Sequence, residues 1–449
     1  MDWVLLAAIL IFLIILLVAR WPVRVSLGIY ALLLPFDAVL IPAKVGNTHL
    51  HLTWFVGAGA AGVLLTTALL GRGFVRPPRS ALWLTLLVFW AATSSLWAIN
   101  TERAVFRLPL IALLLLLYLT AVSIRVNKKE LATIAWLAIL GGCLAAAISI
   151  YQFSSGQGFT SVHAAELRDQ LSGRGTLWTT NPNYLGATLI LPLSLALGQL
   201  LSSTSRLRRL LLMGVIALIG GGIYLTMSRG VLLASAVVSM VFFWRSRSRR
   251  RMLGAMAVLA IILMAMPTRF FLRLGESLTD RGAGRLDIWM VGLRALKHYG
   301  IVGAGLDCFP DAYNEYIHTG LNFVGFSRSP HNIYLATGVE LGIVGLVLLL
   351  SVIAGHLLLA TKVCRATLDE VSRLQVISYE AACWGLLAVG FSLDLLWETY
   401  FWLTLMLLVI AVRSWQTSRA AVYLGAGPCR EGLVARASTP LPPYSHHIS

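Results

Sequence analysis

Charged residues are scarce in this sequence: only 12% of its 449 residues are Asp, Glu, Lys or Arg, whereas 58% are hydrophobic. With a mean hydropathy of +0.80, a chain of this length is too apolar to be a water-soluble domain. Apolar stretches long enough to cross a bilayer recur along it, which is typical of packed spanning helices and not of β-barrel strands. We therefore predict an all-α, polytopic transmembrane helical bundle.

The sequence also lacks patterned cysteines and clustered carboxylates. Its five cysteines show neither a Cys-x-x-Cys spacing nor a Cys/His ligand pattern, so no disulfide framework and no zinc site is predicted. The acidic residues of the later outer loop are scattered, without the paired carboxylates that a divalent cation would need: Asp280, Asp287, Asp307, Asp311 and Glu315. We therefore expect no metal ion and no other cofactor.

The apolar runs predict twelve or thirteen spans and one membrane domain over residues 1–415. The thirteen runs lie near 3–19, 22–42, 52–70, 81–98, 104–124, 131–153, 183–201, 209–226, 228–244, 252–268, 332–361, 376–394 and 396–412. The first run has neither the basic flank nor the cleavage site of a signal peptide, so we expect it to remain as a helix. Residues 416–449 are predicted to be a disordered cytoplasmic tail.

Basic residues outnumber acidic ones, with 36 Lys and Arg against 19 Asp and Glu and a formal charge of +17. They gather in alternate short loops, which is the positive-inside pattern of cytoplasmic loops. No nucleic-acid module accompanies them, so nucleic acid is not expected as a partner. The long loops at 154–182 and 269–330 then face outward, the second one partly helical, and these are the places where chemistry is expected.

One arginine lies in a very short connection between two predicted spans. In YLTMSRGVLLA the connection consists of Ser228, Arg229 and Gly230, which places Arg229 at or just inside the outer membrane face. An arginine at depth costs about 2.5–3.5 kcal/mol on insertion scales, so it normally pairs with an anion or lines a wet cavity. The alternative is a side chain that extends to the interface at a tight hairpin.

A second arginine, Arg285, begins a predicted amphipathic helix. Apolar residues follow it at helical spacing, which favours a helix lying on the membrane surface: Leu286, Trp289, Met290, Leu293 and Leu296. Three glycines end this helix in a flexible turn: Gly300, Gly303 and Gly305. A plain interfacial helix without a functional role is the alternative interpretation, and we keep it for Arg294 and Lys297.

The stretch GFSRSPHNIYLATGVELGIVGL at 325–346 places polar residues directly before a long apolar run. Pro330 keeps Ser329 out of a helix, and His331 with Asn332 opens the span. A lone histidine at such a boundary is as often structural as functional. Its position on the same side as the outward arginines favours a functional role.

Three arginines share that outer side: Arg174, Arg229 and Arg285. Arg174 precedes Asn181-Pro182-Asn183, a predicted helix start with Asn183 as a possible cap. Guanidinium groups are permanently charged and fork-shaped, so they suit a lipid pyrophosphate. His331 could take the proton of an acceptor hydroxyl as it attacks the sugar carbon, while the arginines hold the leaving diphosphate.

The order of four motifs resembles the O-antigen ligase and O-antigen polymerase superfamily over about residues 170–350. The motifs are GTLWTTNPNYLGATLILPL, LTMSRGVLLA, GRLDIWMVGLRALKHYGIVGAGLDCF and SPHNIYLATGVELGIVGL. The resemblance implies a metal-independent, inverting glycosyltransferase of the GT-C type at the periplasmic face of the bacterial inner membrane. It implies an undecaprenyl-pyrophosphate-linked glycan as donor, and lipid A core or a growing glycan as acceptor.

By motif, the resemblance assigns pyrophosphate binding to Arg229 and Arg285, and acceptor activation to His331. Arg174 is carried over as a third pyrophosphate ligand, and three neighbours are expected to support the site: Ser228, Arg328 and Asn332. An O-antigen ligase is the main hypothesis, and a repeat polymerase shares its donor. A transporter or flippase for lipid-linked sugars is the alternative from another class, and it would need midplane carboxylates in matched halves. Asp37 and Asp394 lie within or near predicted spans, but the two halves of the chain show no repeat.

Overall fold

The computed structural model describes residues 17–36, 40–45, 48–155, 181–245, 284–320, 322–365 and 369–423. Arg174 and the predicted span at 252–268 lie outside these residues, as does nearly all of the predicted span at 3–19.

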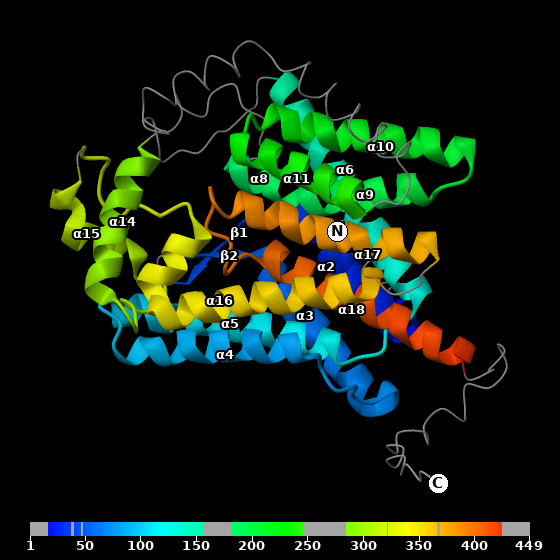
Figure 1. Cartoon of the computed structure of the whole chain (residues 1–449), viewed down its shortest axis with the longest axis horizontal. Helices are drawn as coiled ribbons and strands as arrows, with labels where there is room; N and C mark the ends of the chain where they lie inside the picture. Colours follow the sequence, from blue (N-terminus) through cyan, green and yellow to red (C-terminus); the bar gives the residue numbers. More distant parts are fainter. Residues whose placement is uncertain are drawn as a thin grey trace, which may run out of the picture.

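The described part of the chain is a bundle of helices, most of which run side by side (Figure 1). They are α2 (Pro22–Leu33), α3 (Leu52–Thr67), α4 (Arg79–Thr93), α5 (Thr101–Val122), α6 (Lys128–Ser154), α8 (Pro182–Thr188), α9 (Ile190–Ser202), α10 (Arg206–Leu225), α11 (Arg229–Arg245), α14 (Arg285–Tyr299), α15 (Phe309–Tyr316), α16 (Ile333–Arg365), α17 (Glu370–Val389) and α18 (Thr399–Tyr423). Short turns of helix occur at Leu34–Phe36, Ala68–Arg72, Ser94–Leu96 and Ile317–Thr319.

The predicted class, an all-α polytopic membrane bundle, is confirmed. Six described stretches are long and apolar enough to cross a membrane: Leu52–Gly71, Thr101–Val122, Lys128–Ser154, Pro182–Ser202, Arg206–Leu225 and Ile333–Arg365. Helix α17 packs against α9 and α11, and α4 packs against α16. The predicted outer loop at 269–330 is partly helical, because α14 and α15 form one end of the bundle (Figure 1).

The prediction of a span over 22–42 is wrong. Helix α2 ends at Leu33, and the 3-10 turn that follows contains Pro35. Strands β1 (Leu40–Val45) and β2 (Thr48–His51) then form an antiparallel hairpin. Proline lacks the N–H that would continue a helix, which accounts for the early end of α2.

The predicted boundary of the tail is also displaced. Helix α18 continues to Tyr423, past residue 416 where the tail was expected to begin. Residues 424–449 lie outside the described part of the chain.

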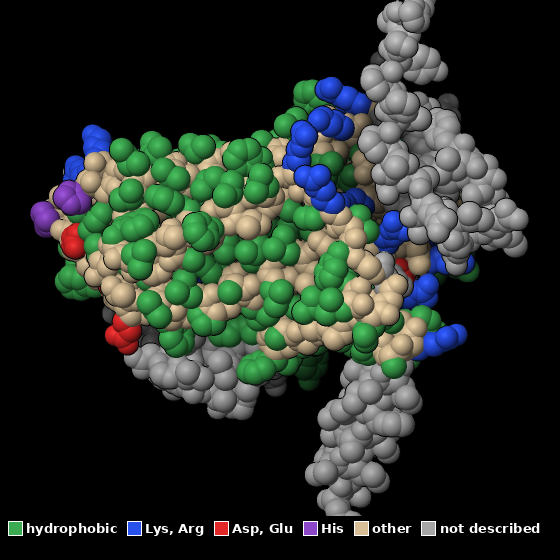
Figure 2. Space-filling model, turned by 90° about the horizontal axis from the view of Figure 1, so that it is seen from below, with side chains coloured by type: hydrophobic (Ala, Val, Ile, Leu, Met, Phe, Trp, Pro, Cys, Tyr) green, Lys and Arg blue, Asp and Glu red, His purple; other side chains and the backbone are tan. Residues whose placement is uncertain are grey.

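The surface separates by chemistry along the bundle. On the face shown in Figure 2, hydrophobic side chains form a broad band between the two ends. Most Lys and Arg side chains gather at one end, whereas the His and most of the visible Asp and Glu side chains lie at the opposite end together with a few basic ones. This is the distribution expected of a protein whose middle part lies in lipid.

Helix α16 is broken near its N-terminus by Gly342, whose backbone has φ +69° and ψ −170°. The loop at 300–305 bonds to the groups that the break frees: the N–H of Ala304 donates to the Val339 carbonyl at 2.8 Å and that of Gly305 to the Glu340 carbonyl at 2.8 Å. From the other side, Trp90 Nε1 donates to the Leu341 carbonyl at 2.8 Å. A broken helix is tolerated at membrane depth only when its backbone groups find such partners.

The loop at 300–305 and the break in α16 lie so close together that neither Gly303 nor Gly342 leaves room for a side chain. A Cβ added to Gly303, at φ +84°, would lie 2.2 Å from the Glu340 carbonyl oxygen, and one added to Gly342 would lie 2.0 Å from that of Ile301. Glycine is therefore needed at both positions, because a Cβ would clash with backbone atoms and because φ is positive.

Replacing Gly303 by alanine should lower the unfolding temperature of the detergent-solubilised protein, because the new Cβ meets backbone at an unfavourable φ. We expect the free energy of unfolding to fall by more than about 1 kcal/mol. Gly59→Ala is the matched control, since nothing lies within 4 Å of a Cβ there, in helix α3. Equal unfolding temperatures for Gly303→Ala and Gly59→Ala would contradict this account of the break.

Candidate active site

The hairpin between α10 and α11 presents Arg229 at the start of α11, as predicted. The turn contains Met227 in the left-handed region, at φ +48°. Ser228 is buried, and its carbonyl accepts from the N–H of Leu232 at 3.0 Å, so this residue starts the helix. A Cβ on Gly230 would lie 2.1 Å from Ser392 Oγ, which means that the hairpin fits closely against the turn between α17 and α18.

Helix α14 begins at Arg285 and ends before Gly300, as predicted. The predicted apolar stripe stays largely at the protein surface, where a helix lying on the membrane would present it. Leu286 and Leu293 are exposed, and the buried residues are Asp287, Ile288, Val291, Gly292 and Ala295. The helix packs on α15 and α16, so contact with the protein decides which face turns inward.

His331 is held in place from two sides. Trp289 Nε1 on α14 donates to the carbonyl of Pro330 at 2.9 Å. The N–H of Ile333 donates to the carbonyl of Gly390, after α17, at 2.8 Å. His331 itself has φ +47°, an uncommon conformation for a residue with a side chain, and such strain is often found at functional sites.

Asn332 is the cap of α16, as the sequence suggested for the pair that opens the span. Its side-chain oxygen accepts from the N–H of Tyr334 at 3.0 Å and from that of Leu335 at 3.1 Å. At the other predicted helix start the cap is Asn181 and not Asn183, because the Asn181 side chain accepts from the Asn183 N–H at 2.9 Å. Both asparagines therefore act on the backbone and position the segments around the site.

Arg229 acts electrostatically on Arg285, and Arg285 acts on His331, although each belongs to a different element. The pKa of Arg285 is lowered by burial and then by the charge of Arg229. The pKa of His331 is lowered to about 4, by burial first and then by the charges of Arg285 and Arg328. These influences hold His331 uncharged at neutral pH.

Two further observations describe this group. His331 Nδ1 is buried and has no hydrogen-bond partner among the described residues. Within the described ranges, Arg285 forms no ion pair with a carboxylate. Arg328 is exposed, and its Nε donates to the Val324 carbonyl at 2.7 Å, which stabilises the loop before His331.

A pocket of about 200 Å³ opens beside these residues. Ser329 and Pro330, which directly precede His331, line it. Four carboxylates line it as well, together with one cation: Asp307, Glu340, Asp394, Glu398 and Arg107. Aromatic side chains complete the wall: Tyr184, Phe309 and Trp397.

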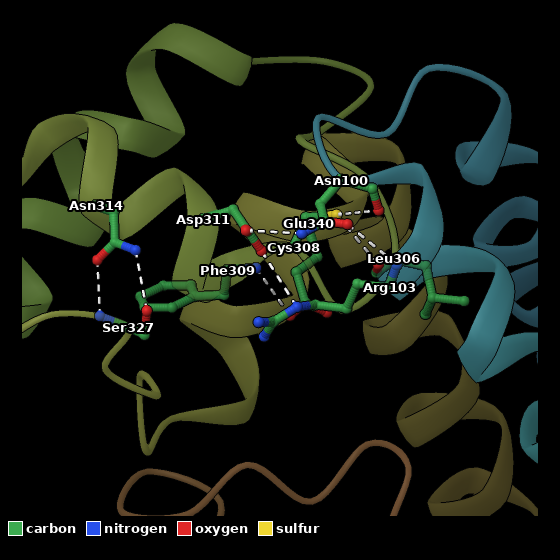
Figure 3. A network of polar contacts seen from close by, with 9 residues as sticks. All are labelled: Asn100, Arg103, Leu306, Cys308, Phe309, Asp311, Asn314, Ser327 and Glu340. Carbon is green, nitrogen blue, oxygen red and sulfur yellow. Dashed lines mark hydrogen bonds and ion pairs between the residues drawn. The ribbon is translucent and has the colours of Figure 1, made fainter. Parts of the chain in front are cut away.

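Burial dominates the electrostatics of this pocket. It raises the pKa of Asp307 and that of Asp394, in the second case to about 6, and the charge of Arg107 partly offsets both increases. The turn that carries Asp307 is fixed by the neighbouring Asp311. That carboxylate accepts from Asn100 Nδ2 at 2.9 Å and lies 3.3 Å from Arg103 Nε (Figure 3).

Sequence reasoning missed most residues of the pocket. Asp307 was considered only as a metal ligand, and Asp394 only as a residue of a transporter. Arg107, Glu340 and Glu398 were not singled out, although each interrupts or borders an apolar run. A charge inside such a run is itself a signal of function in a membrane protein.

The described residues hold no group of three or more His, Cys, Asp or Glu side chains that could bind a metal ion. The pocket carboxylates are therefore not arranged as a ligand set within this part of the chain. We assign no residue to a metal or cofactor.

Residues 212–350 match the family described as O-antigen ligase. The match confirms the resemblance to the O-antigen ligase and polymerase superfamily, and it includes Arg229, Arg285 and His331. Arg107, Tyr184 and the residues between α17 and α18 lie outside the matched range. No curated protein matches the chain.

The imidazole of His331 should stay neutral through pH 6.5 and become protonated only near pH 4. NMR of histidine-labelled protein measures this, with the signal assigned from its loss in His331→Gln. Arg285→Gln removes a positive charge and should move the midpoint upward, whereas Arg294→Gln, at an exposed position on the same helix, should not. A wild-type midpoint near 6.5 would show that burial and Arg285 do not act on His331 as described.

Proposed function

We propose that this chain, as a member of the O-antigen ligase and polymerase superfamily, transfers a glycan from undecaprenyl pyrophosphate to an acceptor hydroxyl. More specifically, we propose that it is an O-antigen ligase with lipid A core as acceptor. The observation that carries the proposal is that Arg229 acts electrostatically on Arg285, and Arg285 on a neutral His331. The superfamily indicates lipid-linked glycan substrates in general terms.

Arg229 and Arg285 bind the pyrophosphate in this proposal. The charge of Arg229 lowers the pKa of the Arg285 guanidinium, so an anion bound between the two groups would be favoured. Each can donate two parallel hydrogen bonds to phosphate oxygens, and burial strengthens the attraction. Because the charge on the leaving diphosphate grows as the bond to the sugar breaks, the same arginines stabilise the transition state. We also propose Arg174 as a third pyrophosphate ligand, and this assignment rests only on its sequence motif.

His331 is the general base. Its imidazole takes the proton from the acceptor hydroxyl as that oxygen forms a bond with the anomeric carbon. The bond from that carbon to the pyrophosphate oxygen breaks, the diphosphate leaves with the electron pair, and the anomeric carbon inverts. Asn332 and Ser228 support this step by fixing the backbone on which His331 and Arg229 lie.

The reaction would take place on the periplasmic side of the bacterial inner membrane. The observation in favour is the distribution of basic side chains, which gather at the end of the bundle opposite α14 and α15 (Figure 2). Positive loops remain in the cytoplasm, so the end that carries Arg285 and His331 faces outward. This GT-C type arrangement needs no metal, because arginines supply the charge that a cation otherwise provides.

A transporter for lipid-linked sugars has one observation in its favour. Transporters use broken spanning helices to bind substrate, and α16 is such a helix. In this chain, however, the loop at 300–305 already bonds to the freed backbone groups. The break thus serves the protein's own packing, and we prefer the transferase.

Conservative substitutions should separate the roles of the arginines and the histidine. Arg229→Lys and Arg285→Lys should each lower turnover at least about tenfold, since lysine cannot make the bidentate contact. His331→Gln should lower turnover about 10²–10⁴-fold, as expected for loss of a general base. Release of undecaprenyl pyrophosphate measures the rate, and Arg294→Lys is the control on α14. Wild-type rates in all three site variants would overturn the proposed roles.

The mass of the product tests the function itself and identifies the acceptor. Purified protein in lipid nanodiscs is given glycan-loaded undecaprenyl pyrophosphate and a chelator, with lipid A core in one sample and only donor in the other. We expect glycan-bearing lipid A core in the first sample, as a ligase would form. Lengthened donor glycan would identify a polymerase, and no release of undecaprenyl pyrophosphate in either sample would contradict a metal-independent transferase.

A further inference from the structure

The pocket beside His331 has a composition that a pyrophosphate site would not have. Four of its side chains are carboxylates, and Arg107 is the one cation among the residues that line it within the described part of the chain. An anionic ligand would be repelled by this surface. The pocket is therefore suited to a neutral ligand that donates hydrogen bonds to carboxylate oxygens.

The same pocket also contains hydrogen-bond donors that lack partners. Trp397 is only 6% exposed, and its Nε1–H is buried without an acceptor among the described residues. Arg107 Nε is likewise buried without a partner in those ranges. An unsatisfied buried donor costs about 1–3 kcal/mol, so each of these groups calls for an acceptor supplied by a ligand or by water. A ligand that both donates and accepts hydrogen bonds would therefore suit this pocket.

Hydroxyl groups have this dual capacity, since each has one donor hydrogen and two acceptor lone pairs. A sugar ring carries several of them around an apolar body, which can pack against the aromatic rings of Tyr184 and Phe309. The pocket volume of about 200 Å³ is below the roughly 300–1,000 Å³ of drug-sized sites. The space therefore suits a single ring better than an oligosaccharide.

We propose that this pocket is a subsite for one sugar ring of a glycan substrate, with Trp397, Arg107 and Glu398 binding its hydroxyl groups. Ser329 and Pro330 belong both to the pocket wall and to the segment that ends in His331, so a bound ring lies next to the base. The inference rests on the proposed transferase function. The ring can come from either of two sources: the acceptor glycan or the first sugar of the donor.

Binding of lipid-free glycans tests the subsite separately from catalysis. The two probes are deacylated core oligosaccharide, for the acceptor, and the donor glycan without lipid or pyrophosphate. Titration calorimetry gives the dissociation constants for wild type, Trp397→Phe and Glu398→Gln. Trp397→Phe removes the N–H and keeps the ring, and Glu398→Gln removes the negative charge and keeps the shape. Trp244→Phe and Glu102→Gln, both at exposed positions, are the matched controls.

We expect one probe to bind the wild type and to bind each pocket variant about tenfold more weakly, with the controls unchanged. The probe that responds identifies the source of the ring. If neither probe binds the wild type, or if the pocket variants bind as tightly as the wild type, the sugar subsite is wrong. If the pocket variants weaken probe binding as expected but the wild-type protein releases no undecaprenyl pyrophosphate, the subsite stands and the transferase is refuted. Thermal unfolding of each variant confirms that it is folded.

Discussion

The break of α16 at Gly342 is the constraint on which the rest of the site depends. Its freed carbonyls at Val339 and Glu340 are bonded by the loop at 300–305. That loop must pass between α16 and the connection from α4 to α5, and only glycine leaves room for it at Gly303. The same loop continues into Asp307 and Phe309, so the hydrogen bonds that satisfy the break also build one wall of the pocket.

Charge is divided between two neighbouring regions of the site. Arg229 and Arg285 form a cationic region beside His331, whereas the pocket beyond Pro330 is lined mainly by carboxylates. A diphosphate and a sugar ring need different surroundings, and in our proposal each binds in one of these regions. His331 directly follows Pro330 of the pocket wall and is kept neutral by burial and by the charges of Arg285 and Arg328. In this account one substrate bridges both regions, and the base acts where they meet.

Local signals in the sequence predicted the elements around the site well. The helix start at Arg285, the hairpin at Ser228 and the cap at Asn332 follow from short-range rules of helix ends and turns. The pocket could not be predicted in this way, because Arg107 and Glu398 are brought together only by packing of distant helices. Which face of α14 turns toward the protein could not be predicted either, because its contacts with α15 and α16 decide it. Arg174 remains a prediction from its motif.

The central claim is that the two arginines hold the diphosphate of the lipid donor while His331 faces the side of the sugar carbon from which the acceptor hydroxyl attacks. The most direct measurement is a cryo-EM structure of the protein with glycan-loaded undecaprenyl pyrophosphate bound in a nanodisc. We expect density for the diphosphate between Arg229 and Arg285, with the imidazole of His331 near the sugar attached to it and on the side away from the diphosphate. Diphosphate density at the opposite, basic end of the bundle, or an ion pair between Arg285 and a protein carboxylate in the complex, would contradict it.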